Sequence, residues 1–170
     1  MNLKTLLTFY DVLLVPQYSD IKSRSEVTLS SDMSEGIELR VPIIASPMDT
    51  VCGATMSTKI ANFGGLGVIH RYNSIDAQAT MISEASGGGT KPVGAAIGIS
   101  QDYLERARAL VDAGASALCL DVAHGDHLLM HVALRNLRDK YGHIVHIMAG
   151  NVATYTGAFA LAQLGAHSIR

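Results

Sequence analysis

The sequence has no tryptophan, and aromatic residues of all kinds make up only 5% of it. It has two cysteines, Cys52 and Cys119, in unlike contexts, which argues against a disulfide framework. No apolar run approaches the ~18 residues of a membrane span. The first residues, Met1 to Lys4, carry no secretory signal pattern. We therefore expect a cytoplasmic protein that neither crosses nor binds a membrane.

Charge is also sparse. Charged residues make up 16% of the chain and the net charge is -2. The basic residues form no stripe, so we expect no nucleic-acid partner. Hydrophobic residues, in contrast, make up 48%, and there are 16 glycines, which suit tight packing of helices on strands. With 170 residues, the chain is long enough for one globular domain with a real core.

An alternation of strands and helices dominates the chain after residue 40. The apolar run 41–45 reads as a buried strand, and Pro47 in the polar turn after it prevents the strand from continuing. Such units recur about every 25 residues. Strands are predicted to begin near Ile43, Leu66, Val93, Ala117, Ile144 and His167, and helices are predicted at Gly53–Phe63, Ile75–Ala85, Gln101–Ala113, Asp126–Tyr141 and Thr154–Leu164. This pattern favours a parallel sheet covered by helices.

Two α/β architectures fit, an open doubly wound sheet and a (β/α)8 barrel of the TIM type. The open sheet would usually carry G-x-G-x-x-G after its first strand, but Ser46-Pro47-Met48-Asp49 stands there. We therefore prefer the barrel. A complete barrel takes ~250 residues, so we expect only about its first five strand–helix units here, as part of a longer protein.

We divide the chain into an N-terminal arm or cap, residues 1–40, and a partial-barrel catalytic domain, residues 41–170. Within the arm, the segments 27–29 and 37–41 are predicted to form a hairpin around Ser34-Glu35-Gly36.

Polar residues follow most of the predicted strands. In a barrel the loops after the strands surround one mouth, so residues far apart in sequence converge there. Two of these residues, Asp126 and Thr154, could equally be helix N-caps. The full set is Ser46, Asp49, Thr50, His70, Arg71, Asp121, His124, Asp126, Asn151 and Thr154.

Five ordered motifs make the chain resemble the IMP dehydrogenase and GMP reductase family. They are Leu7-Thr8-Phe9-Tyr10-Asp11-Val12-Leu13-Leu14-Val15-Pro16, Ala45-Ser46-Pro47-Met48-Asp49-Thr50-Val51, Gly65-Leu66-Gly67-Val68-Ile69-His70, Asp121-Val122-Ala123-His124-Gly125 and Ala149-Gly150-Asn151-Val152. The resemblance implies an eight-stranded barrel. It also implies an NAD- or NADP-dependent oxidoreductase that interconverts IMP and XMP, or GMP and IMP, through a cysteine–purine adduct.

The resemblance also implies roles for single residues. Ser46, Met48, Asn151 and Arg170 would contact the purine nucleotide. Asp121, Val122, Ala123 and His70 would lie on the cofactor side. In the family the attacking cysteine follows the sixth strand, so the nucleophile is expected beyond Arg170 and residues 1–170 alone are expected to be inactive. Cys52 and Cys119 would be packing residues. A monovalent cation and a homotetramer are expected only for the full-length enzyme.

The choice between dehydrogenase and reductase stays open in the sequence. Only residues 85–92 separate the second helix from the third strand, so the nucleotide-sensing (CBS-type) insert of many dehydrogenases is absent. This absence and Lys22-Ser23-Arg24-Ser25 favour a reductase, whereas Ser46-Pro47-Met48 also resembles dehydrogenases.

Two other functions compete with this one. A metal-dependent hydrolase could use Asp121, His124, Asp126, His127 and His131, because His127 and His131 are four residues apart on a predicted helix and would share a face. Alternatively, the chain could be a non-catalytic truncated barrel that survives by pairing with another chain.

Overall fold

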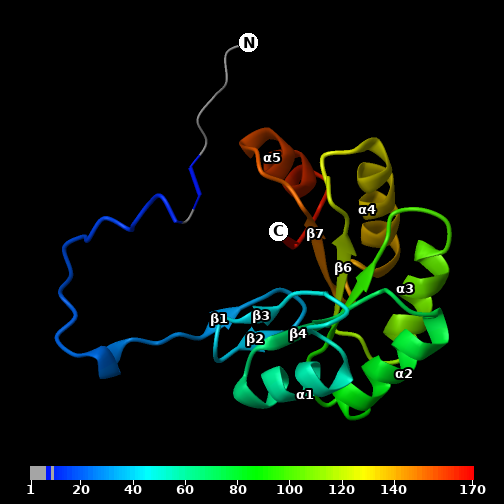
Figure 1. Ribbon diagram of the computed structural model, residues 1–170, viewed down its shortest axis with the longest axis horizontal. Coiled ribbons are helices and arrows are strands. Elements are labelled where there is room, and N and C mark those ends of the chain that lie inside the picture. Colours follow the sequence, from blue (N-terminus) through cyan, green and yellow to red (C-terminus); the bar gives the residue numbers. More distant parts are fainter. Residues whose placement is uncertain (1–6, 9) are drawn as a thin grey trace.

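A curled sheet of six parallel strands forms the centre of the computed structural model, which describes residues 7, 8 and 10–170 (Figure 1). Each strand pairs with the next one along the chain, in the order β3-β4-β5-β6-β7-β8. The strands are β3 (Ile44–Ala45), β4 (Leu66–Ile69), β5 (Gly94–Ile97), β6 (Ala117–Asp121), β7 (His146–Gly150) and β8 (Ser168–Ile169). This is the half-barrel that the repeating strand–helix units predict.

Five α-helices in the described residues connect these strands and cover the convex face of the sheet. They are α1 (Ala54–Phe63), α2 (Ile75–Ser86), α3 (Tyr103–Asp112), α4 (Leu128–Tyr141) and α5 (Tyr155–Gln163). The hydroxyl of Thr154 accepts a hydrogen bond from the Gly157 amide, so Thr154 is the N-cap of α5. Among these helices, none is long and apolar enough to cross a membrane.

Two predicted helix starts are wrong by two residues. Helix α3 does not begin at Gln101, because Gln101 has a φ of 57°, outside the right-handed helical region. Helix α4 does not begin at Asp126, because His127 is its N-cap and accepts a hydrogen bond from the Leu129 amide. Strand β7 begins two residues after Ile144, which still belongs to the turn that follows α4 and donates its amide to the Tyr141 carbonyl.

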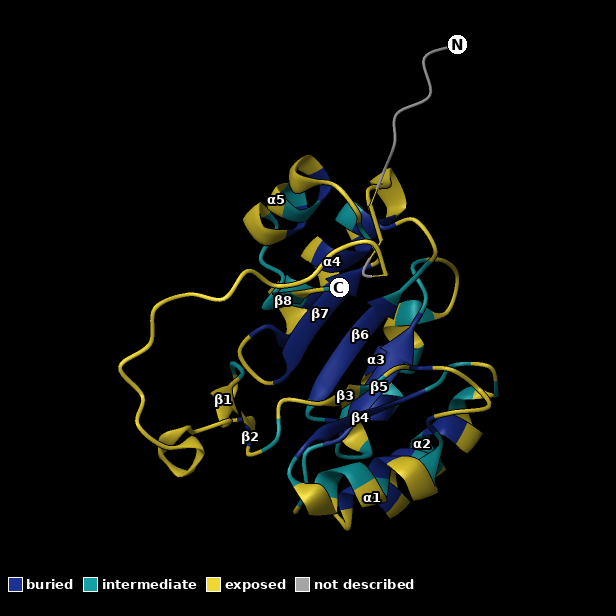
Figure 2. Ribbon diagram, turned by 60° about the vertical axis from the view of Figure 1, so that its left-hand side comes forward, coloured by how far each residue is buried: buried dark blue, intermediate teal, exposed yellow. Residues whose placement is uncertain are grey.

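The two faces of the sheet bury different sets of residues because side chains alternate along each strand. The convex face packs larger aliphatic residues, Ile69, Ile97, Leu118, Leu120 and Ile147, against the helices. The concave face, which would be the barrel interior, buries Leu66, Val68, Ala96, Cys119 and Met148. Buried residues accordingly fill the central strands, whereas residues 10–30 are exposed (Figure 2).

A short antiparallel hairpin, β1 (Ser31–Asp32) and β2 (Glu38–Leu39), lies over one end of the concave face. Ile37 and Leu39 are buried there against Val68 and Met148. The turn falls at Ser34-Glu35-Gly36 as predicted, but the prediction of a strand at 27–29 is wrong. That segment is exposed and precedes the hairpin.

From residue 10 to residue 30 the chain is exposed and contains one short 3-10 helix, η1 (Arg24–Glu26). Phe9, part of the first family-like motif, and Met1 to Lys4 lie outside the described residues. The division of the chain at residue 40 stays a prediction.

Candidate functional site

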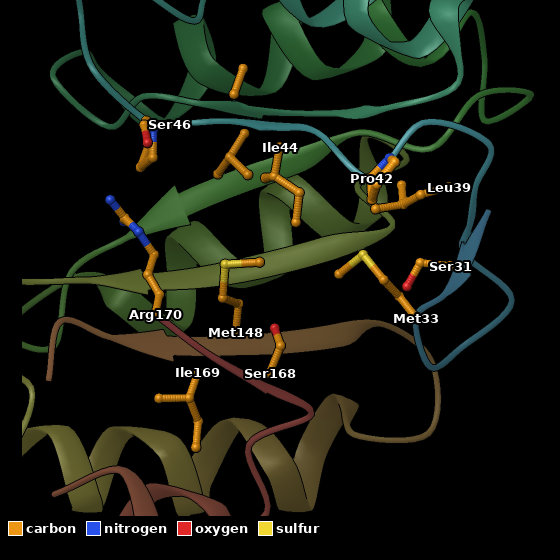
Figure 3. A pocket seen from close by; sticks show the side chains of 13 residues that line it. Ser31, Met33, Leu39, Pro42, Ile44, Ser46, Met148, Ser168, Ile169 and Arg170 are labelled. Carbon is orange, nitrogen blue, oxygen red and sulfur yellow. The ribbon is translucent and has the colours of Figure 1, made fainter. Parts of the chain in front are cut away.

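The carboxyl ends of the strands form one edge of the sheet, which we call the rim. Asp121 is paired in register with Gly150, and Arg170 follows the β7–β8 pair Ala149 and Ile169 directly. Ser46 follows β3 at the same edge, and Ser46 and Arg170 lie at the same end of one cavity (Figure 3). Ser46, Asp121 and Asn151 therefore lie at the same edge of the sheet, as the barrel interpretation requires.

An ion pair joins the last strand to the middle of the sheet. Nη1 of Arg170 donates to Oδ1 of Asp121 at 2.5 Å and lies 3.7 Å from Sγ of Cys119. Both charged side chains are mostly buried, with 25% of the Arg170 side chain and 15% of the Asp121 side chain exposed. Thus two residues that were expected to contact different ligands contact each other.

Gly125 allows the loop after β6 to pack directly against the end of β7. The Asn151 amide donates to the Val122 carbonyl at 2.9 Å, and the Gly125 amide donates to the Asn151 carbonyl at 2.7 Å. A Cβ at Gly125 would lie 2.9 Å from the Asn151 oxygen, closer than real contacts allow. Because no side chain intervenes, the loop after β6, which includes the exposed Ala123, is held against the end of β7.

A cavity of about 370 Å³ lies on the concave face next to the rim. Its walls, which include Val68, are mainly apolar, with Ile44 and Met148 at the centre, whereas Ser46 and Arg170 are at the rim end (Figure 3). Met48 does not line the cavity, and the residue is 53% exposed. The predicted purine contacts therefore separate into Ser46 and Arg170, which line the cavity, and Met48 and Asn151, which do not.

His70 and Arg71 follow β4 at the same rim. Nδ1 of His70 accepts a hydrogen bond from the Tyr72 amide at 3.3 Å, and its own amide donates to the Cys52 carbonyl at 3.2 Å. Nη2 of Arg71 donates to the main-chain oxygen of Asp121 at 3.2 Å. The sequence identified Arg71 only as a polar residue after a strand. Its contact with Asp121, two strands away, follows from the curl of the sheet.

Neither cysteine is placed as a nucleophile. Cys52 and Cys119 are buried, and burial raises the pKa of each thiol to about 11. The reactive form of cysteine is the thiolate, which is scarce at neutral pH when the pKa is so high. Burial of this kind is what packing residues show.

The histidines before and within α4 do not assemble a metal site. His127 lies before the helix and caps it, so the predicted shared face with His131 is wrong. Nε2 of His131 lies 3.6 Å from Oδ1 of Asp126. Within the described part of the chain, no group of three or more His, Cys, Asp or Glu side chains is placed to hold a metal ion.

Comparison with known proteins assigns the half-barrel to a family. The sequence model of the protein family described as IMP dehydrogenase / GMP reductase domain matches residues 6–170. The chain belongs to this family. The match includes the rim residues Ser46, Asp121, Asn151 and Arg170.

Relatives from both branches of the IMP dehydrogenase / GMP reductase family match the chain. The inosine-5'-monophosphate dehydrogenase of Cryptosporidium parvum is 30% identical over an alignment 211 positions long, which covers 99% of this chain and 52% of the relative. That of Borreliella burgdorferi is also 30% identical, over 98% of the chain and 53% of the relative. The GMP reductase of Leishmania donovani is 46% identical over 76 residues, 45% of this chain and 15% of the relative. The chain thus spans about half the length of the first two relatives.

Proposed function

We propose that the chain forms part of an oxidoreductase that acts on a purine nucleotide with NAD or NADP. Its reaction would be the oxidation of IMP to XMP or the reduction of GMP to IMP. The observation that supports this most strongly is the arrangement of Ser46, Asp121, Asn151 and Arg170 at one rim beside an apolar cavity. Family membership supports a purine nucleotide as the substrate class.

The rim residues suit the recognition of a purine nucleotide. Asn151 is exposed at the end of β7 and offers both a donor and an acceptor from its amide. Ser46 offers a hydroxyl at the mouth of the cavity, and Arg170 offers a guanidinium that keeps further donors besides those on Asp121. The apolar walls below them exclude water from one side of a bound base. We place the exposed Met48 beside Ser46 at the entrance.

The cofactor side of the rim is the loop after β6 together with His70. Asp121 has a second carboxylate oxygen besides the one bonded to Arg170, so it could still accept from a ribose or an amide group. Val122 and Ala123 are half-buried and exposed, respectively, in a loop that is fixed to β7. These donors and acceptors fit a nicotinamide nucleotide, which would supply the hydride chemistry.

The nucleophile belongs to a segment outside residues 1–170 in this proposal. Neither Cys52 nor Cys119 can attack a purine from its buried position. Residues 1–170 would therefore bind and orient ligands, and the adduct would form on a cysteine carried by a different segment. The homotetramer and the monovalent cation implied by the family resemblance are proposals for the full-length enzyme only.

The test is turnover by the protein purified from its natural source, in the length in which the cell makes it. IMP with NAD or NADP, and GMP with NADPH, are followed through the absorbance of the reduced nicotinamide. We expect one pair to react, and we expect Asn151→Ala to weaken nucleotide binding about tenfold through a lost hydrogen-bonding group. Asn136→Ala, at an exposed position of α4 away from the rim, is the matched control. No reaction with any pair would overturn the proposal.

A further inference from the structure

Arg71 carries a positive charge at the rim, and no carboxylate of the described residues forms an ion pair with it. In the described residues, the arginines that pair with a carboxylate are Arg106, Arg108 and Arg170. The carboxylate of Asp121 is the partner of Arg170. Among the described residues, the Arg71 guanidinium donates from Nη2 to the main-chain oxygen of Asp121 and lies 5.6 Å from the centre of the Tyr72 ring, whereas its Nε is buried with no hydrogen-bond partner. Burying part of a charged group and leaving one of its donors without an acceptor costs free energy, unless a ligand supplies the missing interaction.

The loop that carries Arg71 is held in place by a buried network. Gln78 is fully buried, and its Nε2 donates to the Ala96 carbonyl at 2.8 Å. Its Oε1 accepts from Nη1 of Arg106 at 2.8 Å, and Nη2 of Arg106 donates to the Asn73 carbonyl at 3.2 Å. Helices α2 and α3 thereby fix the chain just after Arg71. A charged side chain on such a supported loop is preorganised, which is typical of a binding residue.

The guanidinium of Arg71 reaches from the end of β4 to the end of β6 and passes over the end of β5. There Gly98 has no side chain, and a Cβ at that position would lie 3.7 Å from Nη1 of Arg71. Arg71, Arg170 and Asp121 together give this part of the rim a net positive charge. Arginine suits a phosphate here because its planar guanidinium directs the hydrogens of Nη1 and Nη2 to one side, and Nη1, unlike the buried Nε, is open to a phosphate oxygen.

We propose that Arg71 binds a phosphate group of a nucleotide seated beside Asp121. This inference rests on the proposed function, since it names the residue that recognises the anionic part of the ligand. The phosphate belongs either to the purine mononucleotide or to the pyrophosphate of the dinucleotide. The chemistry recognised at Arg71 is the same in both cases.

The experiment titrates inorganic pyrophosphate into chain 1–170 at constant ionic strength and follows the arginine Nε–H resonances by NMR. The Arg71 resonance is assigned by its absence from the spectrum of Arg71→Lys. We expect pyrophosphate to shift this resonance, and Arg71→Gln to weaken pyrophosphate binding about tenfold. Arg71→Lys keeps the charge but loses the planar guanidinium. Its affinity for pyrophosphate should therefore lie between those of the unmodified chain and Arg71→Gln. Arg135→Gln removes the same charge from an exposed position of α4 and should bind as the unmodified chain does.

Paired ligands identify which phosphate is bound. If Arg71 binds the phosphate of the mononucleotide, Arg71→Gln weakens the binding of IMP or GMP. It leaves the binding of inosine or guanosine, which have no phosphate, unchanged. If Arg71 binds the pyrophosphate of the dinucleotide, Arg71→Gln weakens the binding of NAD and leaves the binding of nicotinamide riboside unchanged.

An unshifted Arg71 resonance, or equal pyrophosphate affinity of Arg71→Gln and Arg135→Gln, would overturn the inference. This holds even if the variant folds poorly, because the resonance is observed in the unmodified chain. Arg71-dependent pyrophosphate binding in a protein that turns over no purine nucleotide would instead leave the phosphate site standing and remove the proposed function.

Discussion

Asp121 receives the guanidinium of Arg170 at 2.5 Å from two strands away. Arg170 crosses the end of β7 at Gly150, where a Cβ would overlap the Arg170 main chain. On the other side, Arg71 crosses the end of β5 at Gly98 and donates to the Asp121 carbonyl. Two arginines thus converge on one aspartate at the centre of the rim, each over a glycine, and tie five strand ends together.

Asp121→Asn should lower the free energy of unfolding by about 1–3 kcal/mol, because it leaves the partly buried Arg170 without its counter-ion. The matched control is Asp112→Asn. Asp112 pairs with Arg108 at 3.7 Å, and these side chains are 69% and 74% exposed. That change should cost no more than about 0.5 kcal/mol. Urea unfolding measures both, and equal losses would contradict a structural role for the rim pair.

Stability should fall as the solution is acidified, because of a buried histidine. Burial, followed by the charge of the neighbouring His167, lowers the pKa of His146 from 6.5 to about 4. Between these values the unfolded chain binds a proton that the folded chain does not. The free energy of unfolding is therefore complete above pH 6.5 and decreases as the pH falls toward 4, by on the order of 2 kcal/mol.

Unfolding curves above and below this pH window test the prediction. His146→Gln should flatten the pH dependence, whereas His143→Gln, at an exposed position, should retain it. Some slope should remain in His146→Gln. Burial, and after it the charge of Arg138, also lowers the pKa of His167. A slope that His146→Gln leaves unchanged would rule out His146 as its source.

Chain 1–170 alone should show no nucleotide-dependent change in the absorbance of NADH or NADPH. Its two thiols are buried, and burial raises the pKa of each to about 11. Both should therefore react with an aromatic disulfide reagent slowly at neutral pH and quickly after the chain is unfolded in urea. Turnover that is lost in Cys52→Ala or Cys119→Ala would contradict this assignment.

Gly67→Ala should destabilise the chain by about 2 kcal/mol or more, because there is no space for a side chain between β4 and α1. A Cβ at Gly67 would overlap the main chain of Ser57, whose hydroxyl donates to the Gly67 carbonyl at 3.2 Å. The control is Gly53→Ala, where the nearest heavy atom, Sδ of Met81, would be 4.0 Å away. Thermal unfolding of the two variants gives the comparison, and similar losses would contradict the close packing.

The alternation of strands and helices could be predicted because it depends on local patterns. Apolar runs such as Leu118–Leu120 and helix-capping residues such as Thr154 act within a few residues of themselves. The errors are local as well. Gln101 has a left-handed backbone and His127 acts as an N-cap, and the periodicity of apolar residues signals neither.

The sequence by itself determined the order of the units and the edge of the sheet to which Ser46, Asp121 and Asn151 belong, because parallel strands place their carboxyl ends on one side. Only the tertiary structure decided that Asp121 is paired with Arg170, that Met48 lies outside the cavity and that Arg71 has an unused donor. These outcomes depend on how strongly the sheet curls and on how far an arginine reaches over a glycine. Both are distances between residues remote in sequence, which no local pattern encodes.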